Sequence, residues 1–381
     1  MSMDNNVPEI RFEGYSEDWK NTAIRELAFF NPKGELPERF KYVDLGAVKG
    51  VSLIAYRNES KESSPSRAQR LAMRGDVFYQ TVRPYQKNNY LFDKEDSDYV
   101  FSTGYAQLRP YSDGNFLLNI VQRESFVRDV LNNCTGTSYP AINASVLAGL
   151  EVSYPTTEKE QTQIGAYFYQ LDSIINQHQK KHDKLKNIKR AMLEKMFPKT
   201  GETVPEIRFE EGSGDWEEIQ LSDEVTFING RAYCQEELLD KGKYKVLRVG
   251  NFYTNSSWYF SDMELGDKYY ANYGDLLYTW SASFGPHVWN GDKVIYHYHI
   301  WKLELSDNID KLFLLHLLDY DREKILSGSN GSTMIHITKF AMEAKKVFIP
   351  KKDEQAKIGK YFQQLDKLIS QHQQQITKLN K

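Results

Sequence analysis

The chain has 381 residues, of which 40% are hydrophobic and 27% charged, and its formal net charge is -3. This composition is typical of a water-soluble globular protein with room for two domains, and we expect the protein in the cytoplasm. It excludes a uniformly basic polyanion-binding protein. It also excludes a membrane-spanning protein, because no apolar run approaches roughly 20 residues, and a disulfide-rich secreted protein, because only two cysteines occur.

A stretch near the N-terminus returns in the middle of the chain. Residues 7–19 read VPEIRFEGYSEDW and residues 204–216 read VPEIRFEEGSGDW, with ten of 13 positions identical. A second repeat relates residues 160–185 to residues 354–379, with 15 of 26 positions identical. The period far exceeds the 20–50 residues of solenoid repeats, so each copy is a domain with an appendage.

The first copy is predicted to begin with a module of mixed α/β structure over residues 1–155. Its interior shows only scattered correspondence to the second copy. GDVFY at 75–79 matches GDLLY at 274–278, and TGTSYPAI at 135–142 matches NGSTMIHI at 330–337. The ends of the two copies are repeated, whereas their interiors differ. This pattern indicates two related modules that bind different targets.

A long helix is predicted over residues 156–198, and Pro198 ends it. Its apolar and histidine residues are separated by alternating steps of four and three, which is the a/d pattern of a coiled coil. This predicted seam includes Phe168, Leu171, Ile175 and His178.

The second module is predicted over residues 199–350 and is again of mixed α/β type. VIYHYHIWKLEL at 294–305 alternates with period two and predicts one continuous strand. His297 and His299 would share a face of that strand. A structural role is favoured over metal binding, because no carboxylate or cysteine lies at ligand spacing. The chain contains no phosphate-binding loop or dinucleotide-binding turn.

A second helix is predicted over residues 351–381, with Phe362, Leu365, Ile369 and His372 on its seam. We expect it to pack antiparallel on the first helix, because a whole module separates the two. The predicted fold class is therefore α+β: two α/β modules joined by an antiparallel coiled coil with a pseudo-twofold axis. Packing of each helix on its own module is the alternative. At the matched positions His178 and His372, a residue that sets the register is favoured over a metal ligand.

The order of module, repeated helix, module and repeated helix resembles the specificity subunit of type I restriction-modification systems, over essentially the whole chain. The resemblance is carried by EQTQIGAYFYQLDSII at 160–175, KNIKRAMLEKMFPK at 186–199, INGRAYCQEELLDKGKYKVLRVGN at 228–251 and GDLLYTWSASFGPHVW at 274–289. The second helix is shorter than the first, which leaves open whether the two partner-binding surfaces are equivalent.

The resemblance implies that each module is a target-recognition domain for one half of a split site in double-stranded DNA. The helices would set the gap and bind two modification subunits, which methylate adenine with S-adenosylmethionine. Restriction subunits would add an ATP- and Mg-dependent endonuclease for phage defence. The chain itself would bind no cofactor and catalyse nothing. A coiled-coil scaffold that does not read DNA sequence is the alternative.

Ten residues are predicted to contact DNA. Arginine suits guanine and glutamine suits adenine in the major groove, aromatic rings offer flat contact surfaces, and hydroxyl residues after glycine suit phosphates. Core packing of Trp280 and ordinary turn roles for the hydroxyl residues are the alternatives. The predicted base-reading set is Gln80, Arg83, Tyr85, Arg231, Trp280 and Ser281, and the predicted phosphate set is Thr137, Ser138, Ser332 and Thr333.

Overall fold

The computed structural model describes residues 8–380 apart from 211, 213, 254, 282 and 329–336. The chain divides into two compact units, residues 1–176 and 177–381, and the division falls inside the long helix α4 (Glu158–Met196). The predicted boundaries treat residues 156–198 as a separate helix. In the structure, Ile164 of α4 packs in the core of unit 1 and Leu193 packs in the core of unit 2.

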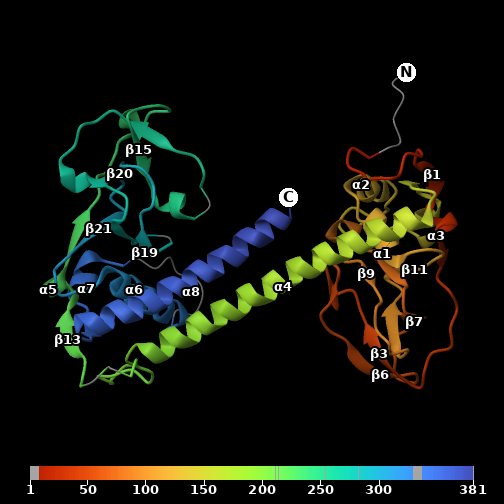
Figure 1. Cartoon of the computed structure of the whole chain (residues 1–381), viewed down its shortest axis with the longest axis horizontal. Helices are drawn as coiled ribbons and strands as arrows, with labels where there is room; N and C mark the ends of the chain where they lie inside the picture. The colour runs from red at the N-terminus through yellow and green to blue at the C-terminus, as the bar shows by residue number, and fades with distance from the viewer. Residues whose placement is uncertain are drawn as a thin grey trace. The chain divides into compact units, whose positions relative to one another are not determined.

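Unit 1 combines short strands with helices that gather on one side of a sheet (Figure 1). Its strands are β1 (Lys20–Ala23), β2 (Ala28–Phe30), β3 (Arg39–Val43), β4 (Val48–Lys49), β5 (Ser52–Leu53), β6 (Arg57–Ser60), β7 (Ala68–Leu71), β8 (Val77–Gln80), β9 (Tyr90–Leu91), β10 (Tyr99–Ser102), β11 (Tyr105–Pro110) and β12 (Glu151–Tyr154). Its helices before α4 are η1 (Ile24–Glu26), η2 (Pro84–Gln86), α1 (Gly114–Val121), α2 (Glu124–Asn132) and α3 (Ala144–Gly149).

Unit 2 contains the second half of α4 and the elements that follow. Its strands are β13 (Glu217–Gln220), β14 (Val225–Asn229), β15 (Tyr244–Leu247), β16 (Tyr259–Ser261), β17 (Tyr270–Ala271), β18 (Leu276–Thr279), β19 (Gly285–Val288), β20 (Val294–Tyr296), β21 (Ile300–Leu305) and β22 (Lys346–Ile349). Its helices are α5 (Leu221–Glu224), η3 (Gln235–Glu237), η4 (Val249–Phe252), η5 (Asp267–Tyr269), α6 (Lys311–Gly328), α7 (Lys339–Glu343) and α8 (Lys352–Leu379).

The two units share one sheet topology, although their interiors have little sequence in common. The strand order β2-β11-β8-β9 in unit 1 matches β14-β21-β18-β19 in unit 2, and β6-β3-β10-β7 matches β16-β15-β20-β17. In both units the second sheet contains one parallel pair, β3 with β10 and β15 with β20. The predicted α+β class with two related modules is confirmed.

The central strand of each unit is buried on both faces. Val77 and Tyr79 of β8 pack in the cluster that includes α1, α2 and α3, whereas Phe78 packs in a separate cluster against the second sheet. In unit 2, Leu276 and Leu277 of β18 divide between two clusters in the same way. Alternate residues of a strand point to opposite faces, so each central strand joins two cores.

The repeated Gly-Asp pair forms the turn that leads into each central strand. Gly75 has φ +93 and Gly274 has φ +90, a left-handed conformation that glycine adopts without strain. Asp76 and Asp275 then accept hydrogen bonds from the backbone N–H three residues earlier, on Met73 and on Asn272, each at 2.8 Å. This shared turn accounts for the match between GDVFY and GDLLY.

The predicted continuous strand at 294–305 is wrong. β20 ends at Tyr296 and β21 begins at Ile300, and residues 297–299 form a connection between them. β20 belongs to the sheet with β15, whereas β21 belongs to the sheet with β18. The chain therefore passes from one sheet to the other, and the alternating pattern runs through both strands and the connection between them.

Within unit 2, α8 and the second half of α4 pack antiparallel. His178 Nδ1 lies 2.8 Å from His372 Nδ1, and Lys189 Nζ lies 2.7 Å from Asp366 Oδ1. Directly after α4, the ring of Phe197 stacks on that of Phe362 at 6.0 Å between centroids. Residue numbers therefore rise along α4 as they fall along α8, which confirms the predicted orientation. Among the described helices, none is long and apolar enough to cross a membrane.

The seam differs from the predicted one in its partners on α4. Phe362 and Leu365 pack with Leu193 and Phe197, which lie beyond the predicted seam residues. The reason is geometric: with His178 opposite His372, a residue N-terminal to His372 meets a residue C-terminal to His178. The other predicted residues, Phe168, Leu171 and Ile175, belong to unit 1, while Ile369 of α8 is half-buried.

Candidate functional site

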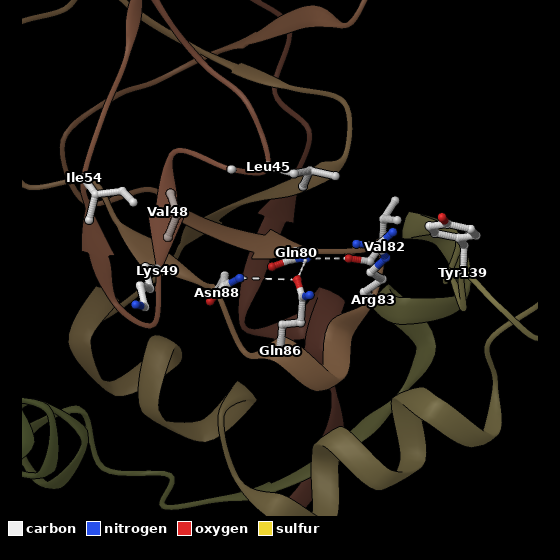
Figure 2. A pocket seen from close by; sticks show the side chains of 11 residues that line it. Leu45, Val48, Lys49, Ile54, Gln80, Val82, Arg83, Gln86, Asn88 and Tyr139 are labelled. Carbon is white, nitrogen blue, oxygen red and sulfur yellow. Dashed lines mark hydrogen bonds between the residues drawn. The ribbon is translucent and has the colours of Figure 1, made fainter. Parts of the chain in front are cut away.

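A pocket of about 430 Å³ opens in unit 1 beside the end of β8. Its walls come from the β4–β5 hairpin, the loop after β8 and the loop before α3 (Figure 2). The polar side chains along it are those of Lys49, Gln80, Arg83, Gln86 and Asn88. The pocket therefore offers two cations and three amides, which can donate to or accept from a polar ligand.

The loop after β8 holds Arg83 in an unusual conformation. Arg83 and Lys87 flank the short helix η2 with φ +55 and +53, a region that non-glycine residues rarely occupy. The Arg83 N–H donates to the carbonyl of Pro140 at 2.7 Å, and the guanidinium lies 4.3 Å from the ring centroid of Tyr139. Tyr85, on η2, is 51% exposed. Backbone strain of this kind is common at binding sites.

Gln80 is held inside the protein beside this pocket. Its Nε2 donates to the carbonyl of Val82 at 2.6 Å and to Oε1 of Gln86 at 2.9 Å (Figure 2). Its Oε1 is buried without a hydrogen-bond partner among the described residues. Gln80 thus fixes the shape of the loop, and its predicted contact with a base requires the side chain to move.

The loop with the predicted phosphate residues lies beside Arg83. Gly136 has φ +86, and the segment closes through backbone hydrogen bonds of 2.9 Å in both directions between Thr135 and Ala141. Thr137 and Ser138 are exposed on this loop. Their predicted counterparts Ser332 and Thr333 lie outside the described residues.

The same strand end in unit 2 carries different chemistry. Trp280 follows β18, its Nε1 donates to the carbonyl of Tyr298 at 2.9 Å, and its ring stacks on Trp301 at 5.9 Å. His299 meets the edge of Trp280 at 4.8 Å between centroids. Ser281 is buried. The segment after β18 therefore presents aromatic and imidazole groups, whereas the segment after β8 presents Arg83 and amide groups.

Arg231 lies in the same region, but its guanidinium is already paired with a carboxylate. Its backbone N–H donates to the carbonyl of Tyr296, and its guanidinium makes two hydrogen bonds to Glu237, of 2.8 and 2.6 Å. This pairing lowers the pKa of Glu237 to about 2. A base contact by Arg231 must compete with Glu237, so it stays a prediction.

Several pocket residues were not among the predicted contacts. Lys49 comes from a two-residue strand of a hairpin that has no strong sequence pattern, and Asn88 follows η2. Tyr139 lies within the short match of 135–142 to 330–337, two residues after Thr137, so its position in that match was an available signal. No group of three His, Cys, Asp or Glu side chains suited to a metal ion is found in the described part of the chain.

Comparison with known proteins identifies the class. Residues 52–187 and 213–381 each match the family described as type I restriction modification DNA specificity domain. The chain therefore belongs to this family, and the predicted resemblance is confirmed.

Individual relatives are more distant. The type I restriction enzyme MjaVIII specificity subunit of Methanocaldococcus jannaschii is 28% identical over 171 residues, which are 44% of this chain and 40% of that protein. The match thus spans less than half of that relative's length.

Solved structures share the fold. The type I restriction-modification S subunit from M. genitalium has a TM-score of 0.65 at 15% identity, over 98% of this chain and 96% of that one. A chain from a structure concerning complex assembly and conformational transition of the type I R-M system has a TM-score of 0.54 at 19% identity, over 98% and 96% of the two chains.

Proposed function

We propose that the chain is the DNA-reading specificity subunit of a type I restriction-modification complex. Each unit reads one half of a bipartite site in double-stranded DNA. The observation that carries the proposal is the difference between the segments that follow the equivalent strands β8 and β18. The same topology presents cationic and amide groups around Arg83 in unit 1, and an indole with imidazoles around Trp280 in unit 2. Different donors and acceptors at one structural position suit different base sequences.

In this proposal the chain contributes recognition and no catalysis. Two modification subunits bring S-adenosylmethionine and methylate adenine, and restriction subunits bring ATP and Mg for cleavage. The loop at Thr137 and Ser138 contacts phosphates beside the first half-site. The length of α4 holds the two half-sites at a fixed gap.

Mapping of methylated adenines tests the proposal. The chain is co-expressed with the modification subunit encoded beside it, and the purified complex is incubated with genomic DNA and S-adenosylmethionine. We expect methylation within one asymmetric, two-part sequence with a constant gap. The chain should also be required for retention of that duplex over a scrambled duplex. A complex that assembles through the chain but shows no sequence preference would instead identify a scaffold.

A further inference from the structure

Each unit joins its repeated N-terminal stretch to its repeated helix through the same contacts. Arg11 pairs with Glu160 in unit 1 through two hydrogen bonds of 2.8 Å. Arg208 pairs with Glu354 in unit 2 at 2.9 and 2.7 Å. An aromatic edge contact accompanies each pair: Phe12 with Tyr167, and Phe209 with Tyr361. The two frames are thus equivalent residue by residue, and their surroundings can be compared directly.

In unit 2, a helical segment covers the outer face of this frame. Phe362 is 0% exposed, and Leu193 and Met196 of α4 pack in the same cluster, together with Phe197 directly after the helix. The N–H of Ile207 donates to the carbonyl of Lys195 at 2.9 Å, so the repeated stretch is also tied to the covering segment. The cover is therefore the segment 185–197, which consists of the last turns of α4 and Phe197.

In unit 1, the equivalent face is open. Phe168, the counterpart of Phe362, is 40% exposed, and Ile10, the counterpart of Ile207, is 90% exposed. Tyr167 is 52% exposed. We call this surface the open α4 face; it consists of Ile10, Tyr167, Phe168, Leu171 and Asp172. Adjacent apolar side chains left in contact with water are characteristic of a binding surface.

A carboxylate on the open α4 face also differs from its matched residue in unit 2, which has a lysine partner. In unit 2, Asp366 accepts Lys189 of the covering segment at 2.7 Å. Asp172 is the matched residue of unit 1, and no ion pair to it is found among the described residues. Burial raises the pKa of Asp172, because the carboxylate loses water without gaining a cation. The face is therefore incomplete in charge as well as in apolar cover.

We infer that the open α4 face binds an amphipathic helix of a partner protein, with the chemistry of residues 185–197. That helix carries Leu, Ile, Met and Phe along one side and a lysine that reaches Asp172. It runs antiparallel to α4, as the covering segment runs antiparallel to α8. A helix of about 13 residues is marginal in water by itself, so the occupant belongs to a larger protein or folds on binding.

A synthetic peptide with residues 184–203 of this chain is the probe, titrated into the full chain by calorimetry. We expect one peptide per chain. The matched site in unit 2 stays occupied by its own segment, whose tethering gives an effective concentration in the mM range for short connections. Absence of peptide binding would overturn the inference.

Three variants locate the site. Phe168→Ser should weaken peptide binding at least tenfold. Asp172→Lys should also weaken it, and a peptide with Lys189→Asp should restore binding to that variant. Tyr169→Ser is the matched control, because Tyr169 is 56% exposed and its counterpart Gln363 is exposed outside the covered face.

Two further outcomes show where the peptide binds and what covers the open α4 face. Equal binding by the Phe168→Ser variant and the native chain would place the peptide elsewhere and reject the open α4 face. Sedimentation of the native chain measures its oligomeric state. A dimer that the Phe168→Ser substitution dissociates would mean that a second copy of this chain, and not a partner protein, covers the face. Unchanged melting of the variants shows that they remain folded.

Discussion

At the scale of single residues, Arg83 is the side chain best placed to read a base in unit 1. Its guanidinium lies over the Tyr139 ring and its backbone N–H donates to Pro140, so little conformational entropy remains to be lost on binding. Arg83→Ala should relax discrimination at the first half-site by about 1–3 kcal/mol and leave the second unchanged. Methylation profiles of the assembled complex measure both half-sites together.

The matched control for this substitution is Trp280→Ala in unit 2. It should relax the second half-site alone, provided that the variant remains folded, since Trp280 also stacks on Trp301. Equal loss of discrimination at both half-sites in the Arg83 variant would contradict a base-reading role and point to a general phosphate contact.

Asp76 is the residue on which the turn before β8 depends. It is 1% exposed and accepts from Arg109 Nε and Nη2 at 2.8 and 2.9 Å and from Gln107 Nε2 at 2.6 Å. Asp76→Ala leaves a half-buried guanidinium without its partner, and should lower the free energy of unfolding of unit 1 by about 3–5 kcal/mol. Urea unfolding followed by tryptophan and tyrosine fluorescence measures this change.

Asp275→Ala is the corresponding substitution in unit 2. Asp275 accepts from the Asn272 N–H, and no arginine is paired with its carboxylate in the described part of the chain. Its loss should cost about 1 kcal/mol, the usual value for one hydrogen bond. Similar costs for the two substitutions would mean that the arginine adds nothing to the turn.

The residue scale is also where the sequence predicted least. Chemistry alone favoured Gln80 as a base reader, yet the fold buries it and uses its amide to hold the loop. Lys49 and Tyr139 complete the pocket from segments distant in sequence. The short repeat match marks the segment of Tyr139, but no spacing along the chain could reveal that it converges with Lys49. Side-chain roles depend on tertiary packing, which period and composition do not encode.

At the scale of elements, the sequence predicted the helices better than the strands. The heptad pattern and Pro198 place the end of α4 well, because both signals are local. The pattern at 294–305 failed because it reports burial and does not report which sheet a residue joins. The seam partners of Phe362 likewise depended on the register of two helices, which a repeat does not specify.

The close approach of α8 to α6 depends on Gly359. A Cβ at this position would lie 2.7 Å from Leu312 Cβ and 2.7 Å from the Phe313 backbone nitrogen, which cannot move freely. Gly359→Ala should therefore destabilise unit 2 by about 1–3 kcal/mol, despite the higher helix propensity of alanine. Thermal unfolding measures the effect. Gly266→Ala, where a Cβ meets nothing within 4 Å, should be nearly neutral.

At the scale of the whole molecule, α4 is the element shared by both units. If its length sets the gap between half-sites, four residues inserted after Ile174 should add about 6 Å and rotate the following part by about 40°. The assembled complex should then methylate sites with a longer gap between unchanged half-sites. The same four residues added after Lys381 leave α4 intact and should leave the gap unchanged. An unaltered gap in the α4 insertion would show that another element determines the spacing.

The distribution of histidine gives the molecule an uneven response to acid. All 8 histidines lie beyond residue 177, so unit 1 contains none. Burial lowers the pKa of His316 to about 3 and that of His287 to about 4, with Lys189 adding to the effect on His316 and Arg322 to that on His287. These pKa values lie below the ordinary histidine value of about 6.5, so the folded state favours the neutral ring.

Because the folded pKa values lie below the unfolded ones, unit 2 loses stability in acid. As pH falls below about 6.5, the histidines of the unfolded chain bind protons, whereas His316 and His287 of folded unit 2 stay neutral. Unit 2 therefore loses stability until the folded pKa values are reached. Between pH 7 and pH 5, His316 and His287 should each lower the free energy of unfolding of unit 2 by about 2 kcal/mol. Hydrogen exchange read by mass spectrometry, corrected for intrinsic rates, should show peptides of unit 2 losing protection while peptides of unit 1 keep theirs. His316→Phe should reduce this loss, since His316 lies against Phe362 and its ring nitrogens have no hydrogen-bond partner in the described structure. Equal loss of protection in both units would mean that carboxylates, which both contain, control the acid response.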